Sequence, residues 1–343
     1  MPDHETSPPI TDLSFPQHEG ANETLTTIDS LSNAARQLLA SSSSPATQMT
    51  YRHAWAAFAD WCAARDACPL PAKPTTLIEY IVSMAGGDQR EASTSTGLRM
   101  ATIDKRLAAI SQAHQLARFE SPTKDAVFRK ALKGLRRQIG TRQHCKAPLL
   151  TQDILHILVN IQEPTLPNLW DKAILLLGFA GGFRRSELVA LNVEDLRFVE
   201  EGIRVMLKRG KADQEGQGRE VGIAKGHPGS CPVETVRQWL EAAQIIGEPV
   251  FRPLGRKGLP QAKALSDRAV ARIVKRLAGQ AGLDPRLYAG HSLRAGLATQ
   301  AALNGVPERI IMAQTGHKTQ MMLRRYIRIG GLFRENASAQ LGL

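Results

Sequence analysis

Apolar residues recur at helical spacing between residues 46 and 140 and indicate four helices. The first carries an apolar stripe at i, i+4, i+7 and i+11, formed by Tyr51, Trp55, Phe58 and Cys62. The second is expected at 75–84. The third and fourth are marked by apolar residues at the same spacing, namely Ile103, Leu107 and Ile110, then Phe128, Leu132 and Leu135. This stretch is therefore predicted to be a small all-helical bundle.

The pattern changes after residue 149. A helix is expected at 153–161, and the continuous apolar run 173–179 is typical of a buried helix. Strands are indicated at 196–199, 203–207 and 221–224, and the turn before the last strand, 208–219, is long and rich in glycine and charge. Helices are then expected at 233–244, 266–280, 292–303, 307–314 and 319–328.

These patterns define the predicted organisation of the chain. A length of 343 residues suggests about two domains, at roughly 150 residues each. Residues 1–45 are polar and contain proline, which predicts a disordered tail with at most a short helix at 32–40. We expect a helical domain at 46–140, a linker at 141–149 and a second domain at 150–343. The fold class is then mainly α with a small antiparallel sheet.

Composition excludes several classes of protein. A hydrophobic fraction of 43% supports real cores and excludes wholesale disorder. The sequence has no apolar run near the ~20 residues that span a bilayer, and no basic-then-apolar signal at its start. Its four cysteines form no CxxC pair, so we expect neither zinc nor disulfides, and a reducing cytoplasm.

The net charge of +12 is unevenly distributed. Residues 1–50 have one basic and six acidic side chains, a net charge of −5, which leaves +17 for the remainder. Residues 99–146 hold twelve basic and three acidic side chains, a net charge of +9. This density favours a polyanionic partner such as nucleic acid, although a solvated basic face is the simpler alternative.

A group of polar residues in the second domain carries the candidate chemistry. It consists of Arg184 and Glu187, Lys211, His291 and Arg294, His317, and Tyr326. Two arginines, two histidines, a lysine and a tyrosine suit a phosphate better than a metal, because guanidinium groups bind phosphoryl oxygens bidentately. Such cations can offset the charge of a pentacoordinate transition state, while a tyrosine hydroxyl can act as nucleophile. We therefore expect no metal and no other cofactor.

The order and spacing of these residues resemble the tyrosine recombinase (phage integrase) family. "GGFRRSEL" is similar to the first arginine motif of the family, "HSLRAG" to its His-x-x-Arg box, and "TGHKTQMMLRRY" to its Gly-His turn and nucleophile. The resemblance implies a SAM-like helical core-binding domain and a mixed α/β catalytic domain that form a C-shaped clamp on DNA. It also implies a site-specific recombinase that cleaves and rejoins duplex DNA through a 3′-phosphotyrosine and a Holliday junction, as a homotetramer on two sites with a dimer on each. A bacterial or phage- or plasmid-encoded, nucleoid-associated protein fits this activity.

The same resemblance assigns roles to individual residues. Tyr326 attacks the scissile phosphate, Arg184 and Arg294 bind its non-bridging oxygens, and His317 donates a further hydrogen bond. Lys211 is the general acid for the 5′-hydroxyl, His291 assists proton transfer from the tyrosine, and Glu187 orients the site. Two alternatives stay open: Lys208 could replace Lys211, and Glu187 could be a structural ion-pair partner.

Basic residues are also candidates for contact with DNA. Helix 266–280 places Arg268, Arg272, Lys275 and Arg276 opposite its apolar stripe, which suits a helix lying on a phosphate backbone. The residues expected to bind DNA are Arg52, Arg99, Lys105, Arg106, Arg136, Arg137 and Arg268. Two other functions would use the same set, a DNA-binding protein without activity and a topoisomerase-like relaxing enzyme.

Overall fold

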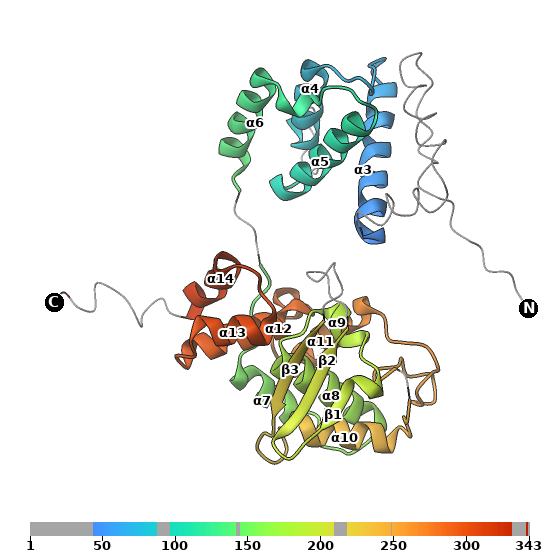
Figure 1. Ribbon diagram of the computed structural model, residues 1–343, viewed down its shortest axis with the longest axis vertical. Helices are drawn as coiled ribbons and strands as arrows, with labels where there is room; N and C mark the ends of the chain where they lie inside the picture. The colour runs from blue at the N-terminus through green and yellow to red at the C-terminus, as the bar shows by residue number, and fades with distance from the viewer. Residues whose placement is uncertain are drawn as a thin grey trace, which may run out of the picture. The chain divides into compact units, whose positions relative to one another are not determined.

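A computed structural model describes residues 44–87, 97–141, 145–208, 218–247, 249–330 and Leu341 of the chain. The chain divides into two compact units, Met1–His144 and Cys145–Leu343, and this division falls inside the segment 141–149 expected to link two domains (Figure 1). The expected tail 1–45 and its helix at 32–40 lie outside the described residues, apart from Ser44 and Pro45.

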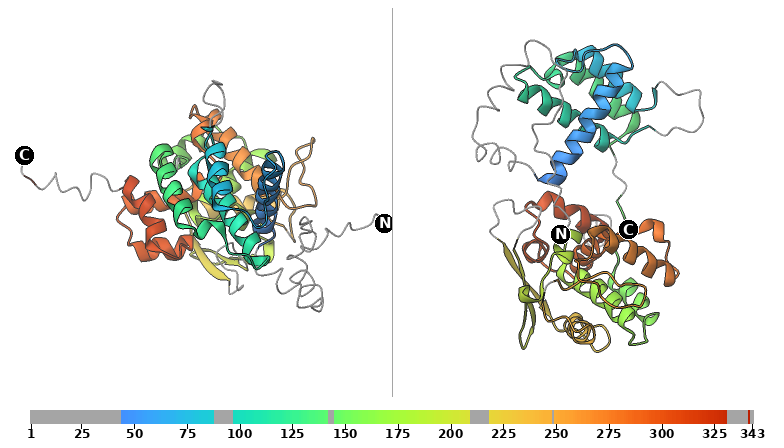
Figure 2. Two further views of the ribbon diagram at one scale, coloured as in Figure 1. Left: turned by 90° about the horizontal axis from the view of Figure 1, so that it is seen from above. Right: turned by 90° about the vertical axis from the view of Figure 1, so that its right-hand side faces the viewer.

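The first unit is a helical bundle, as its apolar periodicity predicts (Figure 2). Its elements are α3 (Pro45–Ala63), α4 (Pro74–Met84), α5 (Met100–Leu116), the 3₁₀ turn η2 (Pro122–Lys124) and α6 (Ala126–Ile139). Side chains cap two of the helices: the Ser44 hydroxyl accepts the Thr47 N–H, and the Asp125 carboxylate accepts the Phe128 N–H. Helix α3 packs on α5, and α4 packs on α6.

Aromatic rings fill the core of this bundle. Phe58 and Tyr80 lie with their ring centroids 4.9 Å apart, and Trp55 meets Phe58 edge to face at 5.9 Å. His114 is fully buried beside them; its Nδ1 donates to the Ile110 carbonyl at 2.8 Å, and its Nε2 accepts the Ala72 N–H at 2.9 Å. Burial lowers the pKa of His114, so the neutral ring bridges α5 and the loop before α4.

The second unit begins with helices that support a small sheet. Helix α7 (Thr151–Val159) is followed by α8 (Leu166–Gly181) and the short α9 (Arg185–Val189). Helix α8 starts seven residues before the apolar run 173–179, because Pro167 occupies its first turn and the run is only its buried half. Then come η3 (Val193–Asp195), β1 (Leu196–Phe198), β2 (Gly202–Leu207), β3 (Arg219–Ala224) and α10 (Pro232–Ala242).

The three strands form one antiparallel sheet in the order β1-β2-β3, as expected. The pairing of β2 with β3 runs from Gly202 opposite Ala224 to Leu207 opposite Arg219. Arg219 is therefore the residue at which the long turn rejoins the sheet. Helices α8 and α10 pack against β3 and cover the buried face of the sheet (Figure 1).

The remaining helices carry most of the candidate chemistry. They are α11 (Asp267–Gln280), the turn η4 (Pro285–Leu287), α12 (His291–Leu303), α13 (Glu308–Thr315) and α14 (Gln320–Gly330). Helix α12 packs on α8, and α13 and α14 pack on α12. A small apolar cluster of Ala298, Ile311 and Leu323 joins these three helices, and Tyr326 packs against it.

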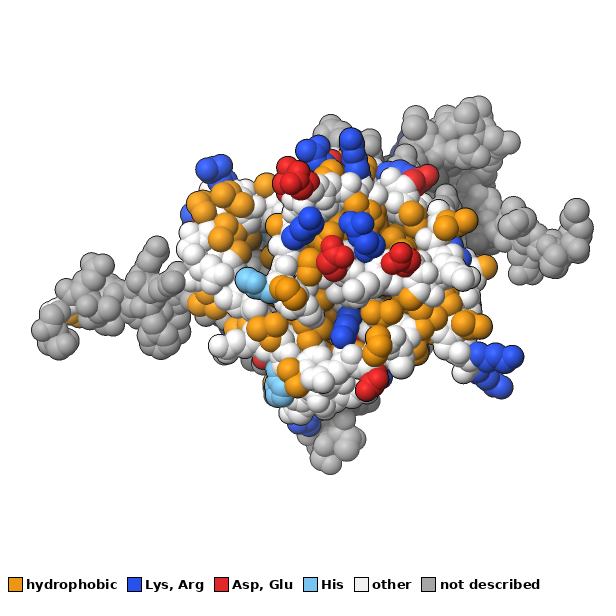
Figure 3. Space-filling view, turned by 90° about the horizontal axis from the view of Figure 1, so that it is seen from below, with side chains coloured by type: hydrophobic (Ala, Val, Ile, Leu, Met, Phe, Trp, Pro, Cys, Tyr) orange, Lys and Arg blue, Asp and Glu red, His pale blue; other side chains and the backbone are white. Residues whose placement is uncertain are grey.

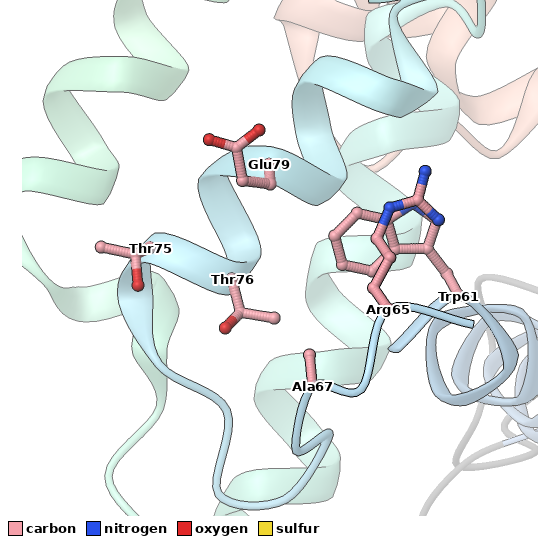
Figure 4. A pocket seen from close by; sticks show the side chains of 6 residues that line it. All are labelled: Trp61, Arg65, Ala67, Thr75, Thr76 and Glu79. Atoms are coloured by element: carbon pink, nitrogen blue, oxygen red, sulfur yellow. The ribbon is translucent and has the colours of Figure 1, made fainter. Parts of the chain in front are cut away.

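The first unit has a hollow on its surface. In the first unit, Trp61, Arg65, Ala67, Thr75, Thr76 and Glu79 line a shallow hollow of about 400 Å³ (Figure 4). The Arg65 guanidinium lies 4.4 Å from the centre of the Trp61 ring, and Glu79 supplies a negative charge nearby, so the hollow is not a uniformly basic surface. The face shown in Figure 3 likewise has basic and acidic side chains interspersed.

Candidate active site

Three segments of the second unit bring the predicted residues together. The first is the end of α8 and the start of α9, which carry Gly182 and Arg184. The second is the first turn of α12, with His291 and Arg294. The third runs from the end of α13 into α14 and includes His317 and Tyr326. Lys211 lies outside the described residues.

Arg294 is the centre of the arrangement and is only 1% exposed. Its Nη1 donates to the Gly182 carbonyl at 2.8 Å and also to the Thr315 carbonyl. Its Nη2 is buried without a hydrogen-bond partner among the described residues. Burial and then the nearby Arg184 lower the pKa of Arg294 to about 10, so the group stays charged at neutral pH. A buried guanidinium with an unsatisfied nitrogen is suited to receive an anionic oxygen.

Arg184 and Glu187 form a close pair next to Arg294. The Glu187 carboxylate caps α9 by accepting the Arg184 backbone N–H at 2.9 Å, and it accepts Arg184 Nη1 at 2.5 Å. Arg184 Nη2 donates to the Gly316 carbonyl at 3.3 Å. Burial alone would raise the pKa of Glu187, but its hydrogen bonds and the guanidinium groups of Arg184 and Arg219 hold that pKa below its usual value. Glu187 is thus an ionised partner that fixes Arg184, the structural role left open by the sequence.

Arg219 also joins this cluster, although no sequence motif marks it. Its Nη1 donates to the Gln314 carbonyl at 2.8 Å, and its Nη2 lies 3.4 Å from Glu187 Oε2. Burial lowers the pKa of Arg219. The arginine therefore connects the end of the long β2–β3 turn to α13 and to the Arg184–Glu187 pair. Arg219 begins strand β3 after a glycine-rich turn, and its partners are distant in sequence. Hydrophobic periodicity therefore could not indicate its role.

Two glycines in the left-handed conformation hold the arginines. Gly182 ends α8 with φ of 57°, and Gly316 ends α13 with φ of 67°. The Gly182 carbonyl accepts Arg294, and the Gly316 carbonyl accepts Arg184. A Cβ at Gly316 would lie 2.8 Å from Arg219 Nε, so a side chain at this position would also clash with Arg219. The two helix ends thereby aim backbone acceptors at the site.

His317 follows the second glycine and is nearly buried, at 8% exposure. Its Nδ1 lies 2.7 Å from the Thr315 hydroxyl. Burial, followed by the charges of Arg294, Arg184, His291 and Arg219, lowers the pKa of His317 to about 4. The ring is therefore neutral at pH 7 in the free protein.

Tyr326 lies on α14 between the two histidines. Its hydroxyl is 2.6 Å from His291 Nε2, and its ring centroid lies 6.0 Å from that of His291 and 5.7 Å from that of His317. The sequence predicted that His291 and Arg294 share one side of a helix; in the structure His291 is exposed at the first turn of α12 while Arg294 is buried. A phenol in hydrogen-bond contact with an imidazole, beside a buried guanidinium, is equipped for nucleophilic attack on a phosphorus atom.

The alternative lysine is engaged elsewhere. Lys208 forms ion pairs with Glu194 and, at 2.9 Å, with Asp195. These hydrogen bonds raise the pKa of Lys208, although the group is exposed and the effect is reduced by solvent. Two carboxylates thus engage Lys208 where the turn begins.

The residues expected to bind DNA differ in their surroundings. Arg106 donates to the Tyr80 hydroxyl at 3.1 Å, and Arg136 forms an ion pair with Asp104 at 2.8 Å. The others are exposed: Arg52, Arg99, Lys105, Arg137 and Arg268. On α11 the apolar stripe is buried as expected, but Arg276 binds the buried Asp171 at 2.5 Å. The exposed Arg276 therefore pairs with a buried carboxylate, and which of these basic residues contact DNA stays a prediction.

The described part of the chain contains neither a metal-binding cluster nor a membrane-spanning helix. No group of three or more His, Cys, Asp or Glu side chains within it could hold a metal ion. Within the same ranges, no helix has the length and hydropathy needed to cross a membrane. The expectation that no cofactor takes part stays a prediction.

The residues of the site lie within a segment that is similar to one family of known proteins. A model of the phage integrase family matches residues 148–330, which contain the whole site. The chain belongs to the phage integrase family. It is a tyrosine site-specific recombinase, an enzyme that cleaves and rejoins DNA through a phosphotyrosine intermediate.

Curated relatives of this chain support the same assignment. An integrase/recombinase XerD homolog of Selenomonas ruminantium is 40% identical over 311 residues, which are 90% of this chain and 88% of the relative. The tyrosine recombinase XerC of Syntrophus aciditrophicus is 31% identical over 180 residues, 52% of this chain and 55% of that protein. The first match extends over both units.

Solved structures share the fold at low sequence identity. The XerH site-specific recombinase bound to palindromic difH substrate, in a post-cleavage complex, gives a TM-score of 0.62 at 16% identity over 94% of this chain and 88% of that chain. A lambda integrase dimer bound to a COC′ core site gives 0.54 at 16% identity, over 91% of this chain and 81% of that chain. The phage integrase fold of this chain, mostly helical with a small antiparallel sheet, is therefore shown independently of the motifs.

Proposed function

We propose that Tyr326 is the nucleophile with which this recombinase cleaves duplex DNA at a specific site, leaving a 3′-phosphotyrosine. The observation that carries the proposal is the 2.6 Å contact between the Tyr326 hydroxyl and His291 Nε2, next to the buried guanidinium of Arg294. Cleavage forms an Oη–P bond and breaks the P–O5′ bond. Because the ester is exchanged and not hydrolysed, religation needs no nucleotide.

The two family arginines bind the scissile phosphate in this scheme. Arg184 is held by Glu187 and the Gly316 carbonyl, and Arg294 by the Gly182 and Thr315 carbonyls, so both guanidiniums are fixed before substrate arrives. Preorganised cations of this kind stabilise the developing charge on the non-bridging oxygens without reorganisation during the reaction. His317 supplies a further contact to the phosphate.

Proton transfers complete the exchange. His291 takes the proton of the Tyr326 hydroxyl through Nε2, and Lys211 gives a proton to the departing 5′-oxygen. In religation the same groups act in reverse: Lys211 accepts the proton of the attacking 5′-hydroxyl and His291 returns one to the tyrosine. The ion pairs of Lys208 support the choice of Lys211.

Substitution of the nucleophile tests the scheme. The variant Tyr326→Phe removes only the hydroxyl, so DNA binding should be unchanged while covalent adducts with a nicked suicide substrate disappear. Tyr288→Phe is the matched control and should keep adduct formation, because Tyr288 lies outside the cluster in the loop before α12. Adducts formed by Tyr326→Phe would overturn the assignment. Absence of adducts in the unmodified protein would leave only a DNA-binding function.

The assembly is inferred from the chemistry of the reaction. We propose a dimer on each recombination site and a homotetramer on two sites, because sequential exchange of two strand pairs passes through a Holliday junction. Paired sites should therefore yield recombinants and trapped junctions. Relaxation of supercoiled DNA without such a site would indicate a topoisomerase-like enzyme. A bacterial cytoplasm, with the protein on the nucleoid, fits this activity and the bacterial origin of the relatives.

A further inference from the structure

Thr315 contacts two groups of the active site and is fully buried. Its backbone carbonyl accepts Nη1 of Arg294, and its hydroxyl lies 2.7 Å from His317 Nδ1. The same hydroxyl lies 2.6 Å from the carbonyl oxygen of Ile311, one turn earlier in α13. This residue has no assigned role in the scheme above.

The donors and acceptors around the hydroxyl define where its proton lies. The Ile311 carbonyl can only accept, and two oxygens 2.6 Å apart require a hydrogen between them. The Thr315 proton is therefore directed to Ile311, and the hydroxyl oxygen has only its lone pairs left for His317. The contact at 2.7 Å then requires that the hydrogen on the histidine side be carried by Nδ1.

We propose that Thr315 is a positioning residue that holds neutral His317 as its Nδ1–H tautomer, so that Nε2 carries a lone pair until the ring gains a proton. The consequence of this tautomer for phosphate binding rests on the proposed function. Nε2 can donate a hydrogen bond to a phosphate oxygen only as part of an imidazolium. Binding of the scissile phosphate is then coupled to uptake of one proton from solvent by His317.

The charges around His317 explain why the proton arrives with the phosphate. Arg184, Arg219 and Arg294 oppose a positive ring from three different segments, and His291 does so from α12. Among the described residues, Glu187 is the one carboxylate of the cluster. Tyr326 faces the ring from α14. A bound phosphodiester adds a negative charge beside these groups and favours the protonated ring.

Nitrogen NMR of the free, full-length protein tests the tautomer directly. The chain has nine histidines, and His317→Gln identifies the signal of interest. We expect protonated Nδ1 and unprotonated Nε2 for His317 at pH 7. Thr315→Val removes the hydroxyl at constant shape and should release the ring to the Nε2–H form, whereas Thr315→Ser should keep Nδ1–H. An Nε2–H ring in the unmodified protein, or a tautomer unchanged by Thr315→Val, would overturn the proposal.

Calorimetric titration with a DNA site in buffers of different ionisation enthalpy tests the coupling. The unmodified protein should take up more protons on binding at pH 7 than His317→Gln, by up to one. Equal uptake by the two proteins would refute the coupling. The outcome is independent of Tyr326, because Tyr326→Phe should show the same tautomer and the same uptake even if the cleavage scheme fails.

Discussion

Arg219 shows how one side chain joins separate parts of the site. It reaches from the first residue of β3 to Glu187 and to the Gln314 carbonyl, so the turn that carries Lys211 is tied at one end to the arginine cluster. We therefore regard Arg219 as a positioning residue for Glu187 and for Lys211, the proposed general acid.

Replacing this side chain by lysine should separate positioning from charge. Arg219→Lys keeps the positive charge but loses the planar fork that serves two acceptors. Misplacement of reacting groups by about 1 Å costs up to about 100-fold in rate, so the rate of adduct formation should fall while DNA affinity changes little. Arg204→Lys, an exposed position on β2, is the control and should have no effect. A matched loss of DNA affinity would show that Arg219 binds DNA directly.

At the scale of elements, helix ends shape the site more than helix interiors do. Both left-handed glycines are C-terminal caps, and each offers its carbonyl to an arginine. Thr315 and His317 flank the second of these caps. The site is therefore sensitive to the geometry of two short turns.

A pair of alanine substitutions distinguishes backbone strain from crowding. Gly316→Ala and Gly229→Ala both place a Cβ at positive φ, which costs roughly 1–2 kcal/mol. Only at Gly316 does the new Cβ meet Arg219, whereas the position at Gly229 is open. Denaturant unfolding should show a loss for both variants, but the suicide-substrate assay should show lost cleavage for Gly316→Ala alone. Normal cleavage by Gly316→Ala would show that Arg219 can move without consequence.

The buried His114 gives the first unit a dependence on pH. Its pKa is lowered by burial, so the unfolded chain binds a proton that the folded chain does not as pH falls below about 6.5. Stability should therefore decrease with acidification, by at most about 1.4 kcal/mol per pH unit for one proton. His317 contributes in the same direction, so the difference between the unmodified protein and His114→Gln isolates the effect. Parallel stability curves for the two proteins from pH 7 to 5 would contradict this account.

Much of the fold and of the candidate site could be predicted from the sequence. Helices such as α3 and α5, and all three strands, were predicted because a buried stripe imposes a period on the chain. The family motifs marked Arg184, His291, Arg294, His317 and Tyr326, which the structure brings together. Arg219 and Thr315 were not predicted, since their roles depend on partners from other segments. The basic stripe of α11 is exposed as predicted, but its charge pattern could not reveal that Arg276 also pairs with the buried Asp171.

For the whole molecule, the charge distribution predicts how binding responds to salt. Exposed Arg137 lies in the last turn of α6, inside the basic segment 99–146, whereas neighbouring Arg136 is paired with Asp104. Each phosphate contact that is lost reduces the slope of log K against log salt concentration by about 1. Arg137→Gln should therefore lower that slope more than Arg136→Gln does, as measured by fluorescence anisotropy on one duplex. Equal slopes for both variants and the unmodified protein would exclude Arg136 and Arg137 from the DNA interface.

The net charge of the ionised groups in the described cluster suits the five-coordinate transition state better than the phosphodiester at rest. The guanidiniums of Arg184, Arg219 and Arg294 and the carboxylate of Glu187 together carry +2. A phosphodiester at rest carries −1, whereas the five-coordinate species formed when a tyrosinate adds to it carries −2. With the proton that His317 is proposed to take up, the site carries +3, so the second negative charge of the five-coordinate species offsets more of this charge than the phosphate at rest does. The active site therefore binds the scissile phosphate at rest less tightly than the transition state of strand cleavage.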